Sequence, residues 1–351
     1  MDYGIQLASS VHHGAVVKRA EELGFTHAWF NDTQLLDADL FVAMTAAAIQ
    51  TSKITLCTGV LIPSNRIAPA AACALASLNE LAPGRIAFGV STGHTARRTM
   101  GLKPVSLARM EEYILMVQAL LGRQTVDWCE EGATHRIRFL NPEAGLINTE
   151  DPIPLHISAF GPKARALTAK LGAGWIGGSG NPAAAANALD EMRAAWQGAG
   201  RDPGDLYSTN LGSGCVLAAG ESADSPRAKA QAGPSASAAL HMLAETGNAE
   251  AKPSGAVAAA LECYRAIHGS YPEAERHLAN HRGHGLFLRP EEAPLITGEV
   301  IRALTRTGTR AELVQTVRQV RDAGFSQFGI QLRHGHEVAM LEDWANVFEH
   351  V

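Results

Sequence analysis

The stretch RIAFGVSTGHTARRTMGLKP, residues 85–104, decides the fold together with PLHISAFGPK, residues 154–163. Each begins as a short apolar strand, passes through a loop that contains glycine, and then enters a helix. Loops that follow parallel strands meet at one edge of the sheet, and the free N–H groups at the start of a helix bind phosphate. The two stretches therefore predict a parallel α/β enzyme with a phosphate-bearing cofactor.

A helix end, a glycine and a strand recur in EELGFTHAWF (21–30), AKLGAGWIGG (169–178) and RDAGFSQFGI (321–330). Glycine at the end of a helix adopts the left-handed conformation that stops it, so helix-then-strand units run through the chain. We place strands near 3–8, 26–31, 54–61, 85–90, 154–159, 174–178, 210–218 and 326–331, and helices at 14–23, 39–51, 69–81, 105–121, 162–171, 183–198 and 309–323. Eight such strands predict a single (β/α)8 TIM barrel, class α/β, in one domain over residues 1–351.

Two segments do not follow this alternation of helices and strands. Residues 123–149 predict a small β excursion, with TVDWCE and HRIRFL as the strands of a hairpin. Residues 220–307 predict a long, partly helical insertion that begins rich in alanine, serine, glycine and proline. An insertion of that length after a barrel strand is typical of a lid over the active site.

The composition narrows the class of protein. Of 351 residues, 46% are hydrophobic and 19% charged, and the net charge is −5, so the chain has no basic excess for nucleic acid. No window of about 18 uncharged apolar residues and no secretory leader stand out, which predicts a cytoplasmic protein without a membrane contact. The five cysteines have no CxxC spacing, which favours reduced thiols over disulfides or a zinc site.

The loops after the predicted strands supply the candidate cofactor site. In the 158–163 loop, Gly161 permits close approach of a ligand, Pro162 suits the first turn of a helix, and Lys163 adds a positive charge, so this loop is predicted to bind phosphate. The alternative is a plain turn with a surface lysine. Ala159 and Phe160 belong to the same predicted site, and Gly178 and Ser179 in the next loop would add further hydrogen-bond donors.

The order of the motifs resembles the bacterial-luciferase-like superfamily of flavin and deazaflavin oxidoreductases, in particular the branch that includes methylenetetrahydromethanopterin reductase. The segments that carry this resemblance are AEELGFTHAWFND (20–32), ITLCTGV (54–60), LNELAPGRIAFGVSTG (78–93), RTMGLKP (98–104), SAFGPK (158–163) and residues 304–325. The resemblance covers nearly the whole chain. It implies an eight-stranded barrel with the cofactor at the carboxyl ends of the strands, and a homodimer.

The resemblance also implies roles for two loops. A non-proline cis peptide is expected within Thr58, Gly59 and Val60, where it would support the flat ring of the cofactor. Asn31 and Asp32 follow the second strand, and there Asp32 would act in catalysis and Asn31 would contact the substrate. The alternative for both residues is a turn or helix cap.

His94 is a departure from the family pattern, because the deazaflavin branch usually carries an acid after the glycine that matches Gly93. Imidazole exchanges a proton near neutral pH, so His94 is predicted to act in catalysis beside a cofactor contact at Gly93. The substitution favours FMN over the deazaflavin cofactor F-420. The alternative for His94 is a solvated loop histidine.

Further histidines lie on loops that follow the strands. His12 and His284 are predicted to line the substrate site, His284 because the insertion should fold over the barrel mouth. The paired histidines of HRGH (281–284) and RHGH (333–336) are residues that often bind metals. Apart from Glu337, however, no further ligand stands at suitable spacing. We therefore expect no metal.

The expected cofactor site and the family resemblance together predict a reaction. The chain has no GxGxxG motif that opens a βαβ unit, so NAD(P)H would act through a separate NAD(P)H:flavin reductase. We expect a monooxygenase that uses reduced FMN and oxygen on a small organic substrate. One alternative is hydride transfer with coenzyme F-420, and another is a flavin-binding protein without catalysis.

Overall fold

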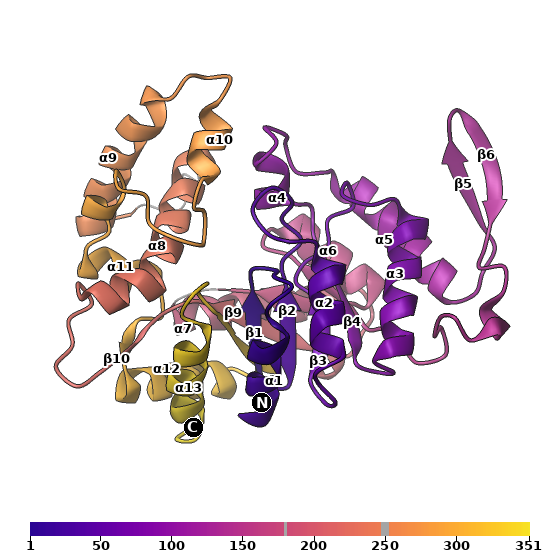
Figure 1. Ribbon diagram of the computed structural model, residues 1–351, viewed down its shortest axis with the longest axis horizontal. Coiled ribbons are helices and arrows are strands. Elements are labelled where there is room, and N and C mark those ends of the chain that lie inside the picture. The colour runs from indigo at the N-terminus through magenta and orange to yellow at the C-terminus, as the bar shows by residue number, and fades with distance from the viewer. Residues whose placement is uncertain (179–180, 247–252) are drawn as a thin grey trace.

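Eight parallel strands close into a barrel in the computed structural model, which describes residues 1–178, 181–246 and 253–351 (Figure 1). The strands follow one another around the barrel in chain order, and the last pairs with the first. They are β1 (Asp2–Leu7), β2 (His27–Phe30), β3 (Thr55–Thr58), β4 (Ile86–Val90), β7 (Leu155–Ser158), β8 (Gly174–Gly177), β9 (Ser208–Gly212) and β12 (Gln327–Gln331). The predicted TIM barrel is confirmed.

Helices cover the outside of the barrel and bury their apolar sides against it. Local signals set their ends: the Ser106 hydroxyl caps the helix that follows it, and Thr309 and Glu312 form a reciprocal capping box. The helices of this layer are α1 (Gly14–Glu22), α2 (Leu40–Ala48), α3 (Ala68–Leu81), α5 (Leu107–Leu121), α6 (Pro162–Leu171), α7 (Pro182–Gly198), α12 (Arg310–Asp322) and α13 (Glu337–Phe348). The last of these was not predicted.

The inside of the barrel is filled by side chains. Trp29, Cys57, Ala87 and Ile176 form a buried cluster there, and Trp29 Nε1 donates a hydrogen bond to Gln327 Oε1 at 2.9 Å. A packed interior leaves the carboxyl ends of the strands as the place where a ligand can bind.

The β excursion is the predicted hairpin. Strands β5 (Val126–Glu130) and β6 (Ala133–Ile137) pair antiparallel and project away from the barrel (Figure 1). Glu131 and Gly132 form the two-residue turn, with φ values of 51° and 77°. Positive φ at both positions is the geometry that matches the twist of a tight hairpin.

The insertion is helical and has its own small core. Its helices are α8 (Pro226–Thr246), α9 (Gly255–Ser270), α10 (Arg276–His281) and α11 (Gly298–Leu304), and they stand together on one side above the barrel (Figure 1). An ion pair of 3.0 Å between Arg227 and Asp343 fastens the start of α8 to α13. The predicted partly helical insertion is therefore present.

The prediction of one strand over 210–218 is wrong. The chain leaves the barrel after β9, and Val216–Leu217 form a separate strand, β10, which pairs with β11 (Gly308–Thr309). At the break, a Cβ on Gly214 would lie 2.0 Å from the carbonyl oxygen of Arg306, so only glycine allows the two segments to pass this closely.

Two further expectations concern the whole chain. Within residues 1–178, 181–246 and 253–351, no helix combines the length and the apolar character needed to cross a membrane. The single domain over residues 1–351 stays a prediction.

Glu21 holds the loop before β3. Its carboxylate accepts hydrogen bonds from the backbone N–H groups of Ser52, Lys53 and Ile54 at 2.6–3.0 Å. Burial opposes ionisation, but these hydrogen bonds prevail and lower the pKa of Glu21. Its contribution to stability is therefore complete above the ordinary pKa of 4.5 and disappears as the pH falls through the lower folded value.

We predict that Glu21→Ala lowers the free energy of unfolding by about 1.5–3 kcal/mol at neutral pH, because three hydrogen bonds to a charged group are lost. Urea unfolding measures this. Glu22→Ala is the matched control, since Glu22 only pairs with Arg19 on the surface and should change the value by less than about 0.5 kcal/mol. Equal effects of the two variants would contradict the prediction.

Candidate functional site

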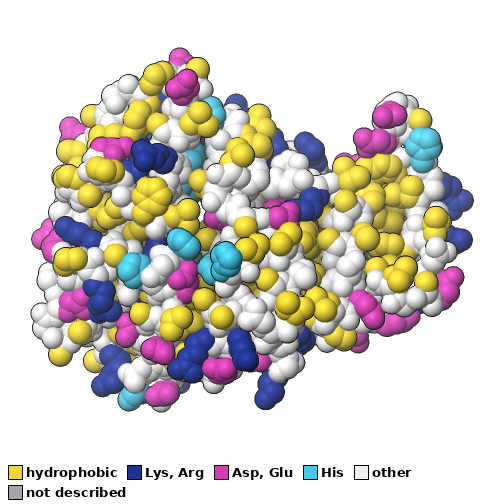
Figure 2. All heavy atoms as spheres, in the orientation of Figure 1, with side chains coloured by type: hydrophobic (Ala, Val, Ile, Leu, Met, Phe, Trp, Pro, Cys, Tyr) yellow, Lys and Arg dark blue, Asp and Glu magenta, His cyan; other side chains and the backbone are white. Residues whose placement is uncertain are grey.

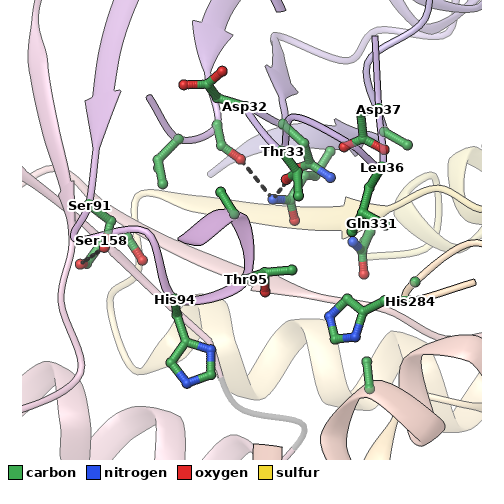
Figure 3. Close-up of a pocket in the computed structure, with 18 of the residues that line it drawn as sticks. Asp32, Thr33, Leu36, Asp37, Ser91, His94, Thr95, Ser158, His284 and Gln331 are labelled. Atoms are coloured by element: carbon green, nitrogen blue, oxygen red, sulfur yellow. Dashed lines mark hydrogen bonds between the residues drawn. The ribbon is translucent and has the colours of Figure 1, made fainter. Parts of the chain in front are cut away.

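A pocket of about 390 Å³ lies at the carboxyl ends of the strands, between the barrel and the insertion. It has the size of an ordinary ligand site. It brings together predicted site residues from five separate loops: Asn31, Asp32, Gly59, Val60, Gly93, His94, Phe160 and His284. Figure 3 shows that Asp32 and Asp37 lie on one side of this pocket and that His94 and His284 lie on the other.

The peptide bond between Gly59 and Val60 is cis, as expected for this position. Both residues line the pocket, and the Gly59 carbonyl oxygen accepts a hydrogen bond of 3.0 Å from Gln6 Nε2. Behind Gly59, an added Cβ would lie 2.6 Å from Trp29 Cβ. The backbone at this point is therefore packed from behind and forms a bare wall of the pocket.

A hydrogen-bond chain runs from this wall to a carboxyl group that the sequence analysis missed. Gln6 Nε2 also donates to Asn31 Oδ1 at 3.0 Å, and the Asn31 side chain in turn hydrogen-bonds to Asp37. Burial raises the pKa of Asp37 to about 7, although hydrogen bonds from Asn31 and the Ser9 backbone oppose the shift. Asp37 lines the pocket, so it can exchange a proton there near neutral pH.

Both carboxylate oxygens of Asp32 accept hydrogen bonds from neighbouring protein groups. One carboxylate oxygen accepts from the Ile62 backbone N–H and the other from Arg66, both at 3.0 Å. Arg66 also pairs with Asp39, which caps α2. These contacts connect the loop after β2 to the loop after β3. The catalytic role of Asp32 stays a prediction.

The short helix α4 (His94–Arg98) carries His94 to the pocket. Gly93 precedes it with φ = 82°, and a Cβ there would lie 2.6 Å from an Ile62 methyl group. Partial burial and the positive charge of Arg98 lower the pKa of His94. His94 is therefore neutral at physiological pH, and a neutral imidazole can donate one hydrogen bond and accept another.

A second cavity of about 320 Å³ adjoins the pocket and shares Gln6, Ser158, Phe160 and Ser213 with it. Gly178 lines this cavity, together with the buried Arg306. Burial lowers the pKa of Arg306 to about 9, which still leaves a cation at neutral pH.

The first turn of α6 stands at the rim beside Phe160. Gly161 is the N-cap, Pro162 begins the helix, and the side chain of Lys163 is exposed. The N–H groups of this first turn have no acceptor inside the helix. A Cβ on Gly161 would meet nothing within 4 Å, so the approach to these N–H groups is open.

The insertion supplies the side of the pocket that carries His284. Arg98 on α4 pairs with Glu245 on α8 at 2.6 Å, which connects the insertion to the opposite rim. Hydrophobic side chains cover much of the outer surface of the insertion, with charged side chains scattered among them (Figure 2). A cavity of about 240 Å³ lined by His94, His241, His281 and His284 adjoins the pocket and shares His94 and His284 with it.

The remaining predicted residues lie outside the pocket. The Thr58 hydroxyl is fully buried and donates to the Gly89 carbonyl oxygen, and the Ala159 carbonyl accepts from Trp175 Nε1. His12 is exposed and does not line the pocket. Ser179 lies outside the described residues.

Within the described ranges, one group has the composition of a metal site. Ligand atoms of His13, His334 and Glu337 lie within 4.8 Å of one another, and Glu337 Oε1 is 3.2 Å from His13 Nε2. The same contacts fasten the loop after β1 to the start of α13. The absence of a metal stays a prediction.

Comparison with known proteins gives a consistent family. The sequence model described as luciferase-like monooxygenase matches residues 7–327. The chain is 28% identical over 213 residues to a 5,10-methylenetetrahydromethanopterin reductase of Methanolobus tindarius, and 29% identical over 208 residues to an F420-dependent glucose-6-phosphate dehydrogenase of Kineococcus radiotolerans. These matches cover 59% and 54% of this chain, but only 63% and 60% of the two relatives.

The fold is also similar to a solved structure. The coenzyme F420-dependent tetrahydromethanopterin reductase of Methanopyrus kandleri superposes with a TM-score of 0.68 at 18% identity. The superposition covers 98% of this chain and 97% of that protein. At this identity the similarity concerns the fold.

Asp37 generates a testable pH dependence. Because burial raises its pKa from 3.8 to about 7, the folded protein holds the extra proton between these values, and stability falls as the pH rises through this window. We predict that Asp37→Asn loses this dependence. Between about pH 5 and about pH 8, its free energy of unfolding should rise by about 1–3 kcal/mol relative to wild type.

Urea unfolding at the two pH values measures the difference. Asp127→Asn, on the exposed hairpin strand β5, is the control and should track the wild type at both. If Asp37→Asn also tracks the wild type, Asp37 ionises normally and the assignment is wrong.

Proposed function

Because the chain belongs to the luciferase-like monooxygenase family, we propose that it is an oxidoreductase that binds a flavin-type cofactor in the pocket between barrel and insertion. We rank hydride transfer with the deazaflavin F420 first and FMN-dependent monooxygenation second. The observation that carries the proposal is that a bare backbone wall and an open helix N-terminus share one rim.

The wall at Gly59 and Val60 fits the flat ring of such a cofactor. No side chain projects from Gly59, and its peptide is held by Gln6 and packed on Trp29. A ring placed on this wall would face Asn31 and Asp37 on one side and His94 on the other. Polar groups on an otherwise fixed surface are what orient a heterocyclic ligand.

The adjoining rim fits a phosphate-bearing tail. The first turn of α6 offers free N–H groups, Lys163 adds an exposed positive charge, and Gly178 opens the next loop. A helix N-terminus attracts anions through its unpaired N–H groups and its dipole. Arg306 is a buried cation in the same cavity.

When bound, the cofactor would accept a hydride from the substrate or donate one to it. The residues of this chain would bind, orient and manage protons. Asp37 would exchange a proton near neutral pH, neutral His94 would hydrogen-bond to cofactor or substrate, and the insertion would limit the access of water.

Two observations bear on the choice of cofactor. The relative from Kineococcus radiotolerans is named as F420-dependent, which supports the deazaflavin. His94 replaces the acid that the deazaflavin branch usually carries, which supports FMN. The oxidation of a hydroxyl group by hydride transfer also releases a proton, which the proton-exchanging groups around the pocket can accept. For this reason we rank F420 before FMN.

The partners follow from the same proposal. A small organic substrate would enter beneath the insertion. With FMN, a separate NAD(P)H:flavin reductase would deliver the reduced cofactor. The homodimer and the cytoplasmic location stay predictions.

We predict that F420 raises the melting temperature of the protein more than the same concentration of FMN does, because F420 should have the lower Kd. A ligand at 100 times its Kd adds about 2.7 kcal/mol to the free energy of unfolding, or about 3–4 °C for a chain of this size. Thermal unfolding with each cofactor measures this. A larger rise with FMN reverses the ranking, a rise without any turnover supports a non-catalytic binding protein, and no rise with either overturns the proposal.

We predict that Lys163→Ala weakens binding of FMN about 2–5-fold while binding of riboflavin, which lacks the phosphate, is unchanged. The loss is small because exposed charges interact weakly. Fluorescence titration measures both affinities. Lys170→Ala is the control, since Lys170 lies on the same helix but pairs with Glu111. Equal loss for FMN and riboflavin would place the phosphate elsewhere.

A further inference from the structure

A buried chain of hydrogen bonds leads from the core of the insertion to the pocket. Arg289 donates to Glu292 Oε1, the same oxygen lies in hydrogen-bond contact with His241 Nε2, and His241 Nδ1 lies 3.2 Å from His284 Nδ1. The side chains of Arg289, Glu292 and His241 are at most 4% exposed. The proposed function uses none of these three residues.

The acceptors fix where the hydrogens lie. An ionised carboxylate only accepts, and Arg289 and His241 lower the pKa of Glu292 to about 2 against the effect of burial, so His241 Nε2 carries a hydrogen. A neutral His241 then has a bare Nδ1, which must accept from Nδ1–H of His284. A neutral His284 with hydrogen on Nδ1 has a bare Nε2.

That bare nitrogen is available to a ligand. His284 lines the pocket, and Figure 3 shows its ring beside Gln331 at the pocket wall. Within the described ranges, no protein group hydrogen-bonds to His284 Nε2.

We propose that His284 is a catalytic residue that accepts the hydroxyl proton of an alcohol substrate, and that His241 and Glu292 are positioning residues that select its tautomer and stabilise the charge. This inference rests on the proposed hydride transfer, because an alcohol loses a hydride and a proton together.

The step balances in atoms and electrons. The C–H bond of the alcohol breaks and its electron pair leaves as hydride to the oxidised deazaflavin. The O–H bond breaks, its proton goes to His284 Nε2, and a carbonyl group forms. The Nδ1 proton of His284 then moves to His241 Nδ1, which makes His241 an imidazolium paired with the Glu292 carboxylate. The charge thus lies inside the insertion instead of in the pocket.

The groups around His241 and His284 explain why these two histidines must share the proton. Burial, His241, His281 and His94 lower the pKa of His284 to about 3, so His284 alone would hold a proton poorly. The titratable and charged groups that face His241 and His284 are His94 and Arg98 on α4, Glu245 on α8, Tyr264 and His268 on α9, His281 on α10, and Arg289 and Glu292 in the segment before α11.

Imidazole nitrogen NMR of the whole protein, with isotope-labelled histidine, shows which ring nitrogens carry hydrogen. It needs neither substrate nor cofactor. We expect hydrogen on Nε2 of His241 and on Nδ1 of His284, with His241→Gln and His284→Gln used for assignment. Glu292→Gln should lower the shared pKa of the pair by about one unit or more, because the carboxylate charge is lost.

His281→Gln is the matched control, because His281 lies in the same HRGH segment but, among the residues that the structure describes, hydrogen-bonds to the His277 carbonyl of its own helix and not to His284. It should leave the tautomer of His284 unchanged. Hydrogen on Nε2 of His284 in the wild type, or an unchanged shared pKa in Glu292→Gln, would overturn the inference.

The pH profile of propan-2-ol oxidation by the F420-loaded protein tests the catalytic step. We expect His284→Gln to lower kcat about 10²–10⁴-fold, and Glu292→Gln to move the acidic limb of the profile to lower pH by the shift that NMR measures. If F420 binds but His284→Gln keeps the wild-type rate and profile, or neither protein oxidises the alcohol, the inference is wrong. If F420 fails to stabilise the protein, the proposed function is wrong.

Discussion

Closure of the eight parallel strands is the constraint on which the site depends. It places the carboxyl ends of all strands on one rim, so residues far apart in the chain meet there. Gln6 shows how directly the site uses this closure, since one side-chain amide joins the strand that bears it to Asn31 and to the Gly59 carbonyl. Trp29 fills the barrel interior beneath, so a ligand of the barrel has to bind at the rim.

The rim carries two kinds of groups. Backbone at Gly59 and at the start of α6 offers shape and N–H donors, which suit a flat ring and an anionic tail. Titratable side chains from the barrel and the insertion face the same space, and burial brings the pKa of Asp37 to about 7 and keeps His284 neutral. A redox reaction that also releases a proton needs both kinds.

The sequence allowed the barrel, the hairpin and the loops that meet at the barrel rim to be predicted, because strand, glycine and helix starts are local patterns. It failed where contacts between distant segments decide. The break after β9 depends on Gly214 meeting Arg306, 92 residues later, as the neighbouring bond from Cys215 to Thr307 illustrates. Asp37 looks like an ordinary loop acid in NDTQLLDAD, and nothing local connects His241 with Glu292, since only the folded insertion brings them into contact.

The ion pair between Arg98 and Glu245 connects the insertion to the opposite rim. Mobile ions screen such a pair, because the Debye length falls from about 10 Å at 0.1 M to about 3 Å at 1 M ionic strength. The side chains are 27% and 13% exposed, so added electrolyte weakens the pair only in part. The rate at which a molecule enters or leaves the pocket should therefore grow with ionic strength even when that molecule is uncharged.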